Sequence, residues 1–175
     1  IITINNSAAN TWDLESLPAL EAVVNELNGM ANVRALVITG QGEKFFSAGA
    51  DLNQFASGDP VAAGAMGDAF GAAFETLADY RGVSIAAING YAMGGGLEVA
   101  LACDIRIAES HAALALPEAR VGLLPCAGGT QRLAQLVGEG WAKRMILCGE
   151  RVSAEKAMTL GLVEELSLIH ISEPT

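Results

Sequence analysis

Cysteine and histidine are scarce in this chain. The three cysteines, Cys103, Cys126 and Cys148, lie more than twenty residues apart, a number and spacing that suit neither a disulfide framework nor a clustered zinc site. The two histidines are His111 and His170, so chemistry that needs several imidazoles is not expected. We therefore expect a protein of the reducing cytoplasm, without a bound metal, in which carboxylates and backbone groups carry any catalysis.

Basic residues and long apolar runs are also lacking. Ten basic against twenty acidic side chains give a formal charge of −10, which opposes extended contact with a nucleic-acid backbone. No apolar stretch approaches the roughly 20 residues of a membrane-spanning helix, and residues 1–10 lack the pattern of a signal peptide. We expect neither a nucleic-acid nor a membrane partner. Hydrophobic residues are abundant, at 51% of 175, which predicts one domain with a substantial core.

Short β-rich runs alternate with longer segments of helical period, as in an α/β domain with parallel strands and crossover helices. The expected strands are 1–5, 35–39, 44–47, 85–88, 105–108 and 113–116. The expected helices are 14–27, 61–80, 97–102, 141–148 and 154–160. Several glycines weaken 61–80 as a helix, at about 1 kcal/mol each relative to alanine.

The most informative segment is 85–104, IAAINGYAMGGGLEVALACD. A buried strand leads through a turn and the three glycines 94–96 into a helix that carries Glu98 among apolar residues. Free N–H groups at a helix start attract negative charge, and glycines let a ligand approach them; alternatively, the glycines only permit tight packing of helix on sheet. An unpaired carboxylate in an apolar stripe shifts its pKa upward. Glu98 is therefore a poised acid or base, or a residue that reaches solvent or pairs with Arg106 or Arg120.

A second carboxylate, Glu118, follows Pro117 in the segment 113–125, ALALPEARVGLLP. Because proline restricts the backbone, it can aim the next side chain. Taken alone, Glu118 is more often an ordinary loop residue. Together with Glu98 it resembles an acid/base pair, in which each proton transfer contributes roughly 10²- to 10⁴-fold.

A third segment, 45–52, has the sequence FFSAGADL. An apolar strand ends at the small residues 48–50, and Asp51 can cap the helix that follows. The small residues would leave the N–H of Ala50 accessible to a ligand. If this N–H and that of Gly95 face one point, they form an oxyanion hole. The alternative is an ordinary strand-turn-helix connection.

In these segments the chain resembles the enoyl-CoA hydratase/isomerase, or crotonase, family. The resemblance runs from the first strand to about residue 166, and is densest in FFSAGADL, AAINGYAMGGGLEVALACD, LALPEARVGLLPCAGGTQRL and SAEKAMTLGLVEEL. It implies an α/β fold of the ClpP/crotonase type, a spiral of ββα units, for a catalytic core over residues 1–166 with a clipped N-terminal edge. Family members usually continue for tens of residues past GLVEEL into helices, so the resemblance also implies that this C-terminal helical region is missing. Residues 167–175, SLIHISEPT, do not resemble the family and read like translated vector or adaptor sequence.

The resemblance implies an enoyl-CoA hydratase, which adds water syn across the 2,3 double bond of a 2-enoyl-CoA thioester. In such enzymes two glutamates hold and activate the water, here Glu98 in GGGLE and Glu118 in LPEARVG. The backbone N–H groups of Ala50 and Gly95 then hold the enolate oxygen. Further substrate contacts are implied for neighbouring residues, namely Ala48, Gly49, Asp51, Leu52, Gly94 and Cys126. No cofactor is implied, since coenzyme A belongs to the substrate, and the parent protein is expected to be a homotrimer or hexamer.

One residue departs from the family pattern. Hydratases often have glycine after the IP or LP pair, where this chain has Cys126. The backbone N–H at this position can still donate to the catalytic water, so the departure concerns local geometry rather than the reaction. Cys126 as a nucleophile is a weaker hypothesis, because no base accompanies it in the sequence.

Other functions are weighed against hydration. Double-bond isomerisation or acyl-CoA hydrolysis would use the same oxyanion hole, and a non-catalytic assembly protein could keep the same fold. A dinucleotide-binding module is disfavoured because residues 90–96 lack the G-x-G-x-x-G spacing. A serine hydrolase is disfavoured because there is no G-x-S-x-G motif and His111 has no evident serine and aspartate partners.

Overall fold

The computed structural model describes residues 1–55 and 58–167. The strands are β1 (Ile2–Ile4), β2 (Ala35–Gly40), β3 (Phe45–Ser47), β4 (Val83–Ile88), β5 (Tyr91–Met93), β6 (Ile105–Glu109), β7 (Ala113–Ala115), β8 (Val152–Ser153) and β9 (Glu165–Ser167). The α-helices are α1 (Ser16–Gly29), α2 (Pro60–Ala78), α3 (Gly95–Ala102), α4 (Gly129–Leu147) and α5 (Ala154–Leu160). Three 3-10 helices are η1 (Ser7–Ala9), η2 (Leu52–Phe55) and η3 (Glu118–Val121).

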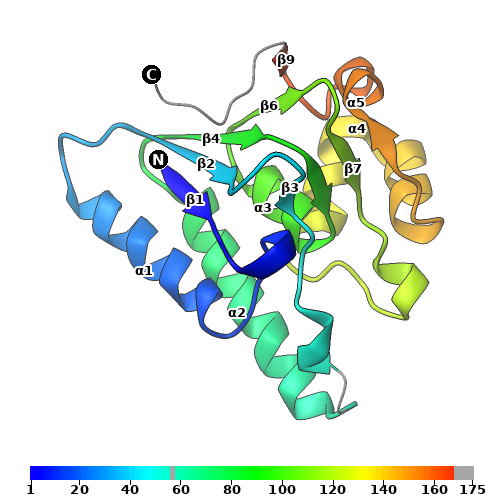
Figure 1. Ribbon diagram of the computed structural model, residues 1–175, viewed down its shortest axis with the longest axis horizontal. Coiled ribbons are helices and arrows are strands. Elements are labelled where there is room, and N and C mark those ends of the chain that lie inside the picture. The colour runs from blue at the N-terminus through cyan, green and yellow to red at the C-terminus, as the bar shows by residue number, and fades with distance from the viewer. Residues whose placement is uncertain (56–57, 168–175) are drawn as a thin grey trace.

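The strands form two sheets, and from β2 to β7 successive strands along the chain are added alternately to one sheet and to the other (Figure 1). The larger sheet has the order β1-β2-β4-β6-β9 and is parallel throughout, and the smaller has the order β3-β5-β7-β8. Each successive unit places one strand in each sheet and then a helix: β2, β3 and α2, then β4, β5 and α3, then β6, β7 and α4. This arrangement confirms the predicted α/β spiral of ββα units.

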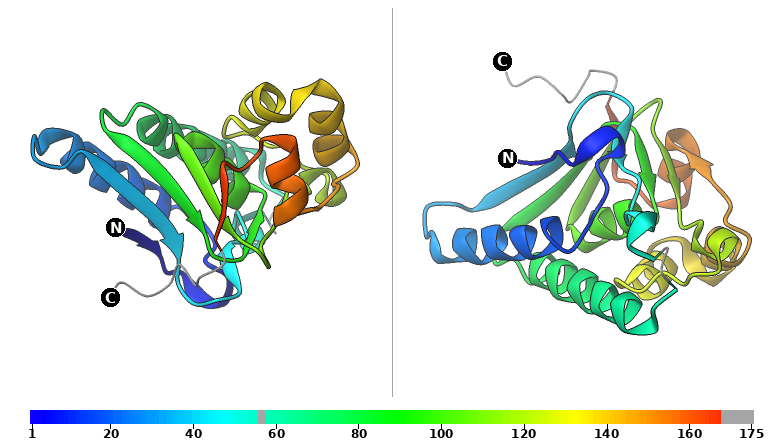
Figure 2. Two further views of the ribbon diagram at one scale, coloured as in Figure 1. Left: turned by 90° about the horizontal axis from the view of Figure 1, so that it is seen from above. Right: turned by 60° about the horizontal axis from the view of Figure 1, so that its bottom comes forward.

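Helices α1 and α2 pack side by side along one face of the larger sheet (Figure 2). The buried residues of each helix recur three or four positions apart, so they lie on one face of the helix, and this apolar stripe packs inward. The buried residues of these stripes are Leu17, Leu20 and Val24 in α1 and Met66, Phe70, Ala73, Phe74 and Leu77 in α2. The stripe stabilises α2 despite its glycines, so the segment 61–80 is a continuous helix to Ala78. Phe70 lies on the inward stripe and also reaches the cavity described below.

Three elements were missed by periodicity. Strands β5 and β9 have three residues each and β8 has two, so none shows a repeat. Helix α4 begins at Gly129, and the predicted start at 141 is wrong. Its backbone leaves helical geometry at Gly138, where φ is 76°, and this interruption hides the first half of the helix in the sequence.

The end of the predicted core falls within β9. Ser167, the first residue of the segment expected to be foreign, is the last residue of this strand. The rest of that segment, 168–175, lies outside the described residues, and so does His170. Of the helices in 1–55 and 58–167, none is both long enough and apolar enough to cross a membrane.

Candidate active site

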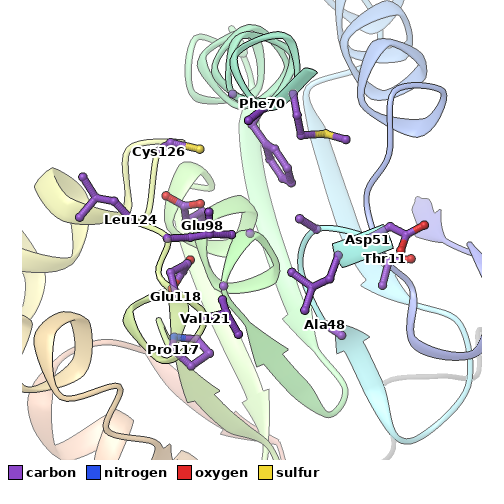
Figure 3. Close-up of a pocket in the computed structure, with 18 of the residues that line it drawn as sticks. Thr11, Ala48, Asp51, Phe70, Glu98, Pro117, Glu118, Val121, Leu124 and Cys126 are labelled. Carbon is purple, nitrogen blue, oxygen red and sulfur yellow. The ribbon is translucent and has the colours of Figure 1, made fainter. Parts of the chain in front are cut away.

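A cavity of about 630 Å³ lies among the N-terminal half of α2, the segment 48–52, the start of α3 and the segment 117–126 (Figure 3). Most of its lining is apolar, with Met66 and Phe70 contributed by α2. The lining residues that carry polar or ionisable side chains are Thr11, Asp51, Glu98, Glu118, Arg120 and Cys126. Such a cavity, apolar with a few convergent polar groups, is typical of a site for a small organic molecule.

The structure brings together nine of the ten residues singled out in the sequence. The cavity is lined by Ala48, Ala50, Asp51, Leu52, Gly94, Gly95, Glu98, Glu118 and Cys126. Gly49 lies behind the wall, where φ is 89° and a Cβ would come within 2.7 Å of the Met93 carbonyl oxygen and 3.0 Å of the Gly95 nitrogen. Glycine at this position lets the backbone around residue 49 approach that of residues 93–95, because a side chain would tolerate neither the positive φ nor the short distance.

The segment around Ala50 is held by a short parallel bridge. Trp12 N–H donates to the Gly49 carbonyl and Asp51 N–H donates to the Trp12 carbonyl, each at 2.8 Å. Because successive N–H groups of an extended chain point to opposite sides, the N–H of Ala50 points away from Trp12. Asp51 also accepts a hydrogen bond from the N–H of Asn53 at 3.0 Å, which caps η2 as expected.

Gly95 is the first residue of α3 and its N–H is one of the amides that an α-helix leaves without an internal partner. The preceding amide, that of Gly94, donates to Ala115 O at 3.0 Å. Within the described part of the chain, no hydrogen bond uses the N–H of Ala50 or of Gly95. Two unpaired backbone donors therefore line one cavity, an arrangement suited to an anionic oxygen.

Glu98 lies in the first turns of α3 and is only 2% exposed. Its Oε1 accepts hydrogen bonds from the N–H groups of Ala127, at 2.8 Å, and Gly129, at 2.9 Å. Burial raises the pKa of this carboxyl above its usual value, while the two amides and the charge of Arg132 act in the opposite direction. Within the described residues no hydrogen bond involves Oε2, so one oxygen is fixed and the other is available to a ligand.

The alternatives considered for Glu98 do not hold. Its side chain is almost fully buried and opens only to the cavity, and Arg106 instead pairs with Glu164. The side chain of Arg120 lies against Gly149, where a Cβ would come within 2.7 Å of its Nε. Glu98 is therefore held by amides at the start of α4 rather than by a salt bridge.

Glu118 opens η3 directly after Pro117. Its Oε2 is buried without a hydrogen-bond partner among the described residues, and its Oε1 lies 3.2 Å from the position of a Cβ at Gly94. Burial, followed by the charge of Glu98, raises the pKa of Glu118 to about 7. Figure 3 shows both glutamates at one wall of the cavity, opposite Ala48. The pair thus combines an amide-held carboxylate with a carboxyl that keeps its proton near neutral pH.

The pKa of Glu118 predicts a pH effect on stability. Between about 4.5 and 7 the folded protein keeps a proton on Glu118 that the unfolded chain has released, so stability falls as pH rises through this window. Glu118→Gln removes this ionisation and is expected to raise Tm at pH 8 relative to the unmodified protein, with little change at pH 5. Thermal unfolding at both pH values measures the difference; an equal Tm difference at both would contradict the assigned pKa.

Cys126 lies at the rim of the cavity as an exposed residue. Partial burial and then the charges of Glu98 and Glu118 raise the pKa of its thiol. Because the thiolate is the nucleophile, the thiol is a poor nucleophile at neutral pH. The raised pKa therefore also disfavours Cys126 as a nucleophile.

The electrostatic coupling of Cys126 to Glu118 can be measured directly. Glu118→Gln removes a nearby negative charge at pH 8, so alkylation of Cys126 by iodoacetamide is expected to accelerate by roughly two- to fivefold. Peptide mapping by mass spectrometry gives the rate. Glu139→Gln is the matched control, since Glu139 is an exposed residue of α4 paired with Lys143, and it should leave the rate unchanged. Equal rates in both variants would disprove the coupling.

Sequence reasoning missed the residues that hold Glu98. Ala127 and Gly129 belong to the run AGGT, where glycines precede a helix as they do at 94–96. The same argument about free amides at a helix start could have been applied there. It would have found donors for an anion, but not that the anion is the Glu98 carboxylate. In the described residues, no group of three or more His, Cys, Asp or Glu side chains is arranged to hold a metal ion.

Comparison with known proteins identifies a family and several relatives that are similar to this chain. Residues 1–167 match the family model described as enoyl-CoA hydratase/isomerase. The short-chain-enoyl-CoA hydratase of Clostridium acetobutylicum is 38% identical over 95% of this chain and 64% of its own length. The 2,3-dehydroadipyl-CoA hydratase of Escherichia coli is 40% identical over 95% of this chain and 64% of its own. The chain thus spans less than two thirds of the length of these relatives.

Solved structures superpose closely on the chain. Pseudomonas aeruginosa DspI is 68% identical with a TM-score of 0.93, covering 94% of this chain and 68% of that one. An enoyl-CoA hydratase from Bacillus anthracis is 40% identical with a TM-score of 0.92, covering 97% of this chain and 66% of that one.

Proposed function

Because the chain belongs to the enoyl-CoA hydratase/isomerase family, we propose that it contributes the site of an enoyl-CoA hydratase, which adds water syn across the 2,3 double bond of a 2-enoyl-CoA thioester. One observation carries the proposal. Two carboxyl groups in different electrostatic settings, Glu98 and Glu118, lie at one wall of a cavity that also contains the unpaired N–H groups of Ala50 and Gly95.

The two amides act on the thioester oxygen. When water adds to the β carbon, negative charge moves through the α carbon to this oxygen, and an enolate forms. Donors already oriented toward that oxygen stabilise the enolate more than the neutral carbonyl, and one such donor typically contributes about 2.7 to 4 kcal/mol to transition-state stabilisation. Ala50 and Gly95 are the donors. The other lining residues 48, 51, 52, 94 and 126 contact the substrate around them.

The two glutamates divide the proton transfers. Glu98, whose anion is held by two amides, accepts a proton from water as the water oxygen bonds to the β carbon. Glu118, whose pKa is about 7, donates its proton to the α carbon as the enolate collapses. Since both act from one wall, hydroxyl and hydrogen arrive on the same face of the double bond, and proton exchange with solvent restores both groups.

The reaction changes no oxidation state overall, so it requires no redox cofactor, and the enolate is stabilised by amides rather than by a metal. The coenzyme A moiety arrives with the substrate. From the family resemblance we also propose that the parent protein assembles as a homotrimer or hexamer, and from its few, widely spaced cysteines that it lies in the cytoplasm. Sedimentation measurements would report the assembly, and a monomer at working concentration would contradict it.

The test is turnover of crotonyl-CoA. Loss of the absorbance of the conjugated thioester, with a product heavier by one water and coenzyme A still attached, is the expected result. Isomerisation would leave the mass unchanged, and hydrolysis would release free coenzyme A. Persistence of the absorbance with crotonyl-CoA and with longer 2-enoyl-CoA substrates would instead favour a non-catalytic assembly protein.

A further inference from the structure

The loop that leads into α4 is held from two sides. On the cavity side, Glu98 Oε1 accepts hydrogen bonds from Ala127 N–H and Gly129 N–H, at 2.8 and 2.9 Å. On the outer side, Arg132 Nη1 donates to the Ala127 carbonyl oxygen at 3.1 Å, and its Nη2 donates to Glu75 Oε1 at 2.9 Å. Ala127 therefore gives its N–H to the carboxylate and its carbonyl to the guanidinium.

Gly128 allows this approach. Its φ is 90°, and a Cβ at this position would come within 2.0 Å of Arg132 Nη1 and 2.9 Å of the guanidinium carbon. The Arg132 side chain, which is 19% exposed, thus packs directly against the backbone of the loop. Its other partner, Glu75, belongs to α2, the helix that also supplies Met66 and Phe70 to the cavity.

We infer that Arg132 is a positioning residue: it fixes the loop so that the amides of Ala127 and Gly129 hold Glu98 as an oriented anion at the cavity wall. Only the expected effect of Arg132 on turnover rests on the proposed function; its effect on Glu98 and on the loop does not. The groups that face Glu98 are Glu118 and Cys126 from the cavity side and Arg132 from α4. Arg132 is the cation among them, so its charge also favours the ionised carboxyl.

The test measures Glu98 in the resting protein, without substrate. Glutamate labelled with ¹³C at the carboxyl carbon reports the Glu98 titration, assigned by its absence in Glu98→Gln. Arg132→Gln is expected to raise the pKa of Glu98, because it removes a positive charge that favours the ionised carboxyl, and to speed hydrogen exchange of the Ala127 amide by about tenfold or more. If turnover is present, kcat falls with little change in KM, and the acid limb of the pH profile moves up with the pKa.

The matched control is Arg144→Gln. Arg144 lies on the same helix and pairs with Glu150 at the surface, so the substitution removes the same charge without touching the loop. It should leave both the Glu98 titration and the Ala127 exchange unchanged. Equal values for Arg132→Gln and Arg144→Gln would overturn the inference.

Arg132→Lys separates charge from geometry. A lysine keeps the charge but lacks the planar fork that joins two acceptors, so the pKa of Glu98 should return toward its original value while Ala127 exchange stays fast. If Arg132→Gln does not fold, Arg132→Lys provides the test. Hydrogen exchange of the Ala127 amide as slow as in the unmodified protein would then reject the inference. Because neither readout needs turnover, absence of hydratase activity would overturn the proposed function alone.

Discussion

Replacing Glu98 by glutamine is expected to lower kcat for crotonyl-CoA hydration by roughly 10²- to 10⁴-fold. The glutamine oxygen can still accept hydrogen bonds from Ala127 and Gly129, so the fold and the position of the side chain are kept. What is lost is the ability to take a proton from water. Stopped-flow or steady-state absorbance of the conjugated thioester measures the change.

Glu118→Gln should lower kcat by a similar factor for the complementary reason, since glutamine has no proton to give to the α carbon.

With Glu118 intact, kcat/KM is expected to fall as pH rises above about 7, because the protonated form of Glu118 disappears. The double variant should lose less than the product of the single losses, because the two residues act as a unit. Glu139→Gln, on an exposed pair of α4, serves as the control, and a Glu98→Gln enzyme as active as this control would reject the assigned chemistry.

Gly96→Ala is expected to destabilise the fold by about 3 kcal/mol or more. A Cβ at this position would come within 2.1 Å of the Ser47 carbonyl oxygen and 2.7 Å of the Ser47 carbonyl carbon. Both are backbone atoms of β3, and Ser47 is fully buried, so the contact is relieved only by separating α3 from that strand. Against a total stability of roughly 5 to 15 kcal/mol, this is a large fraction.

Thermal and denaturant unfolding measure this effect, which corresponds to a fall in Tm of roughly 6 to 12 °C for a chain of this size. Gly71→Ala is the matched control. It lies inside α2, and no atom lies within 4 Å of a Cβ there, so the better helix propensity of alanine should stabilise the protein by roughly 0.5 to 1 kcal/mol. Equal effects of the two substitutions would show that α3 does not pack on β3 as described.

The long elements were predictable because their apolar spacing repeats. The helical period over 14–27 and 61–80 corresponds to α1 and α2, whose buried stripes cover the larger sheet. Brief strands such as β5, with three residues, have no period to detect. The break at Gly138 divides the repeat of α4, which explains why only its second half was expected.

Residue types and their local spacing are enough to predict which groups are available and in what order: two glutamates in restrained settings, glycine runs before helices, and small residues at the end of a strand. Those are local properties, set by residue type and by neighbours a few positions away. Folding is what places the amides of Ala50 and Gly95 at one cavity, and what gives Glu98 amide partners 29 and 31 residues away rather than an arginine. The direction of an N–H group and the pKa of a carboxyl depend on atoms brought close by folding, and the spacing of residues along a chain does not contain those distances.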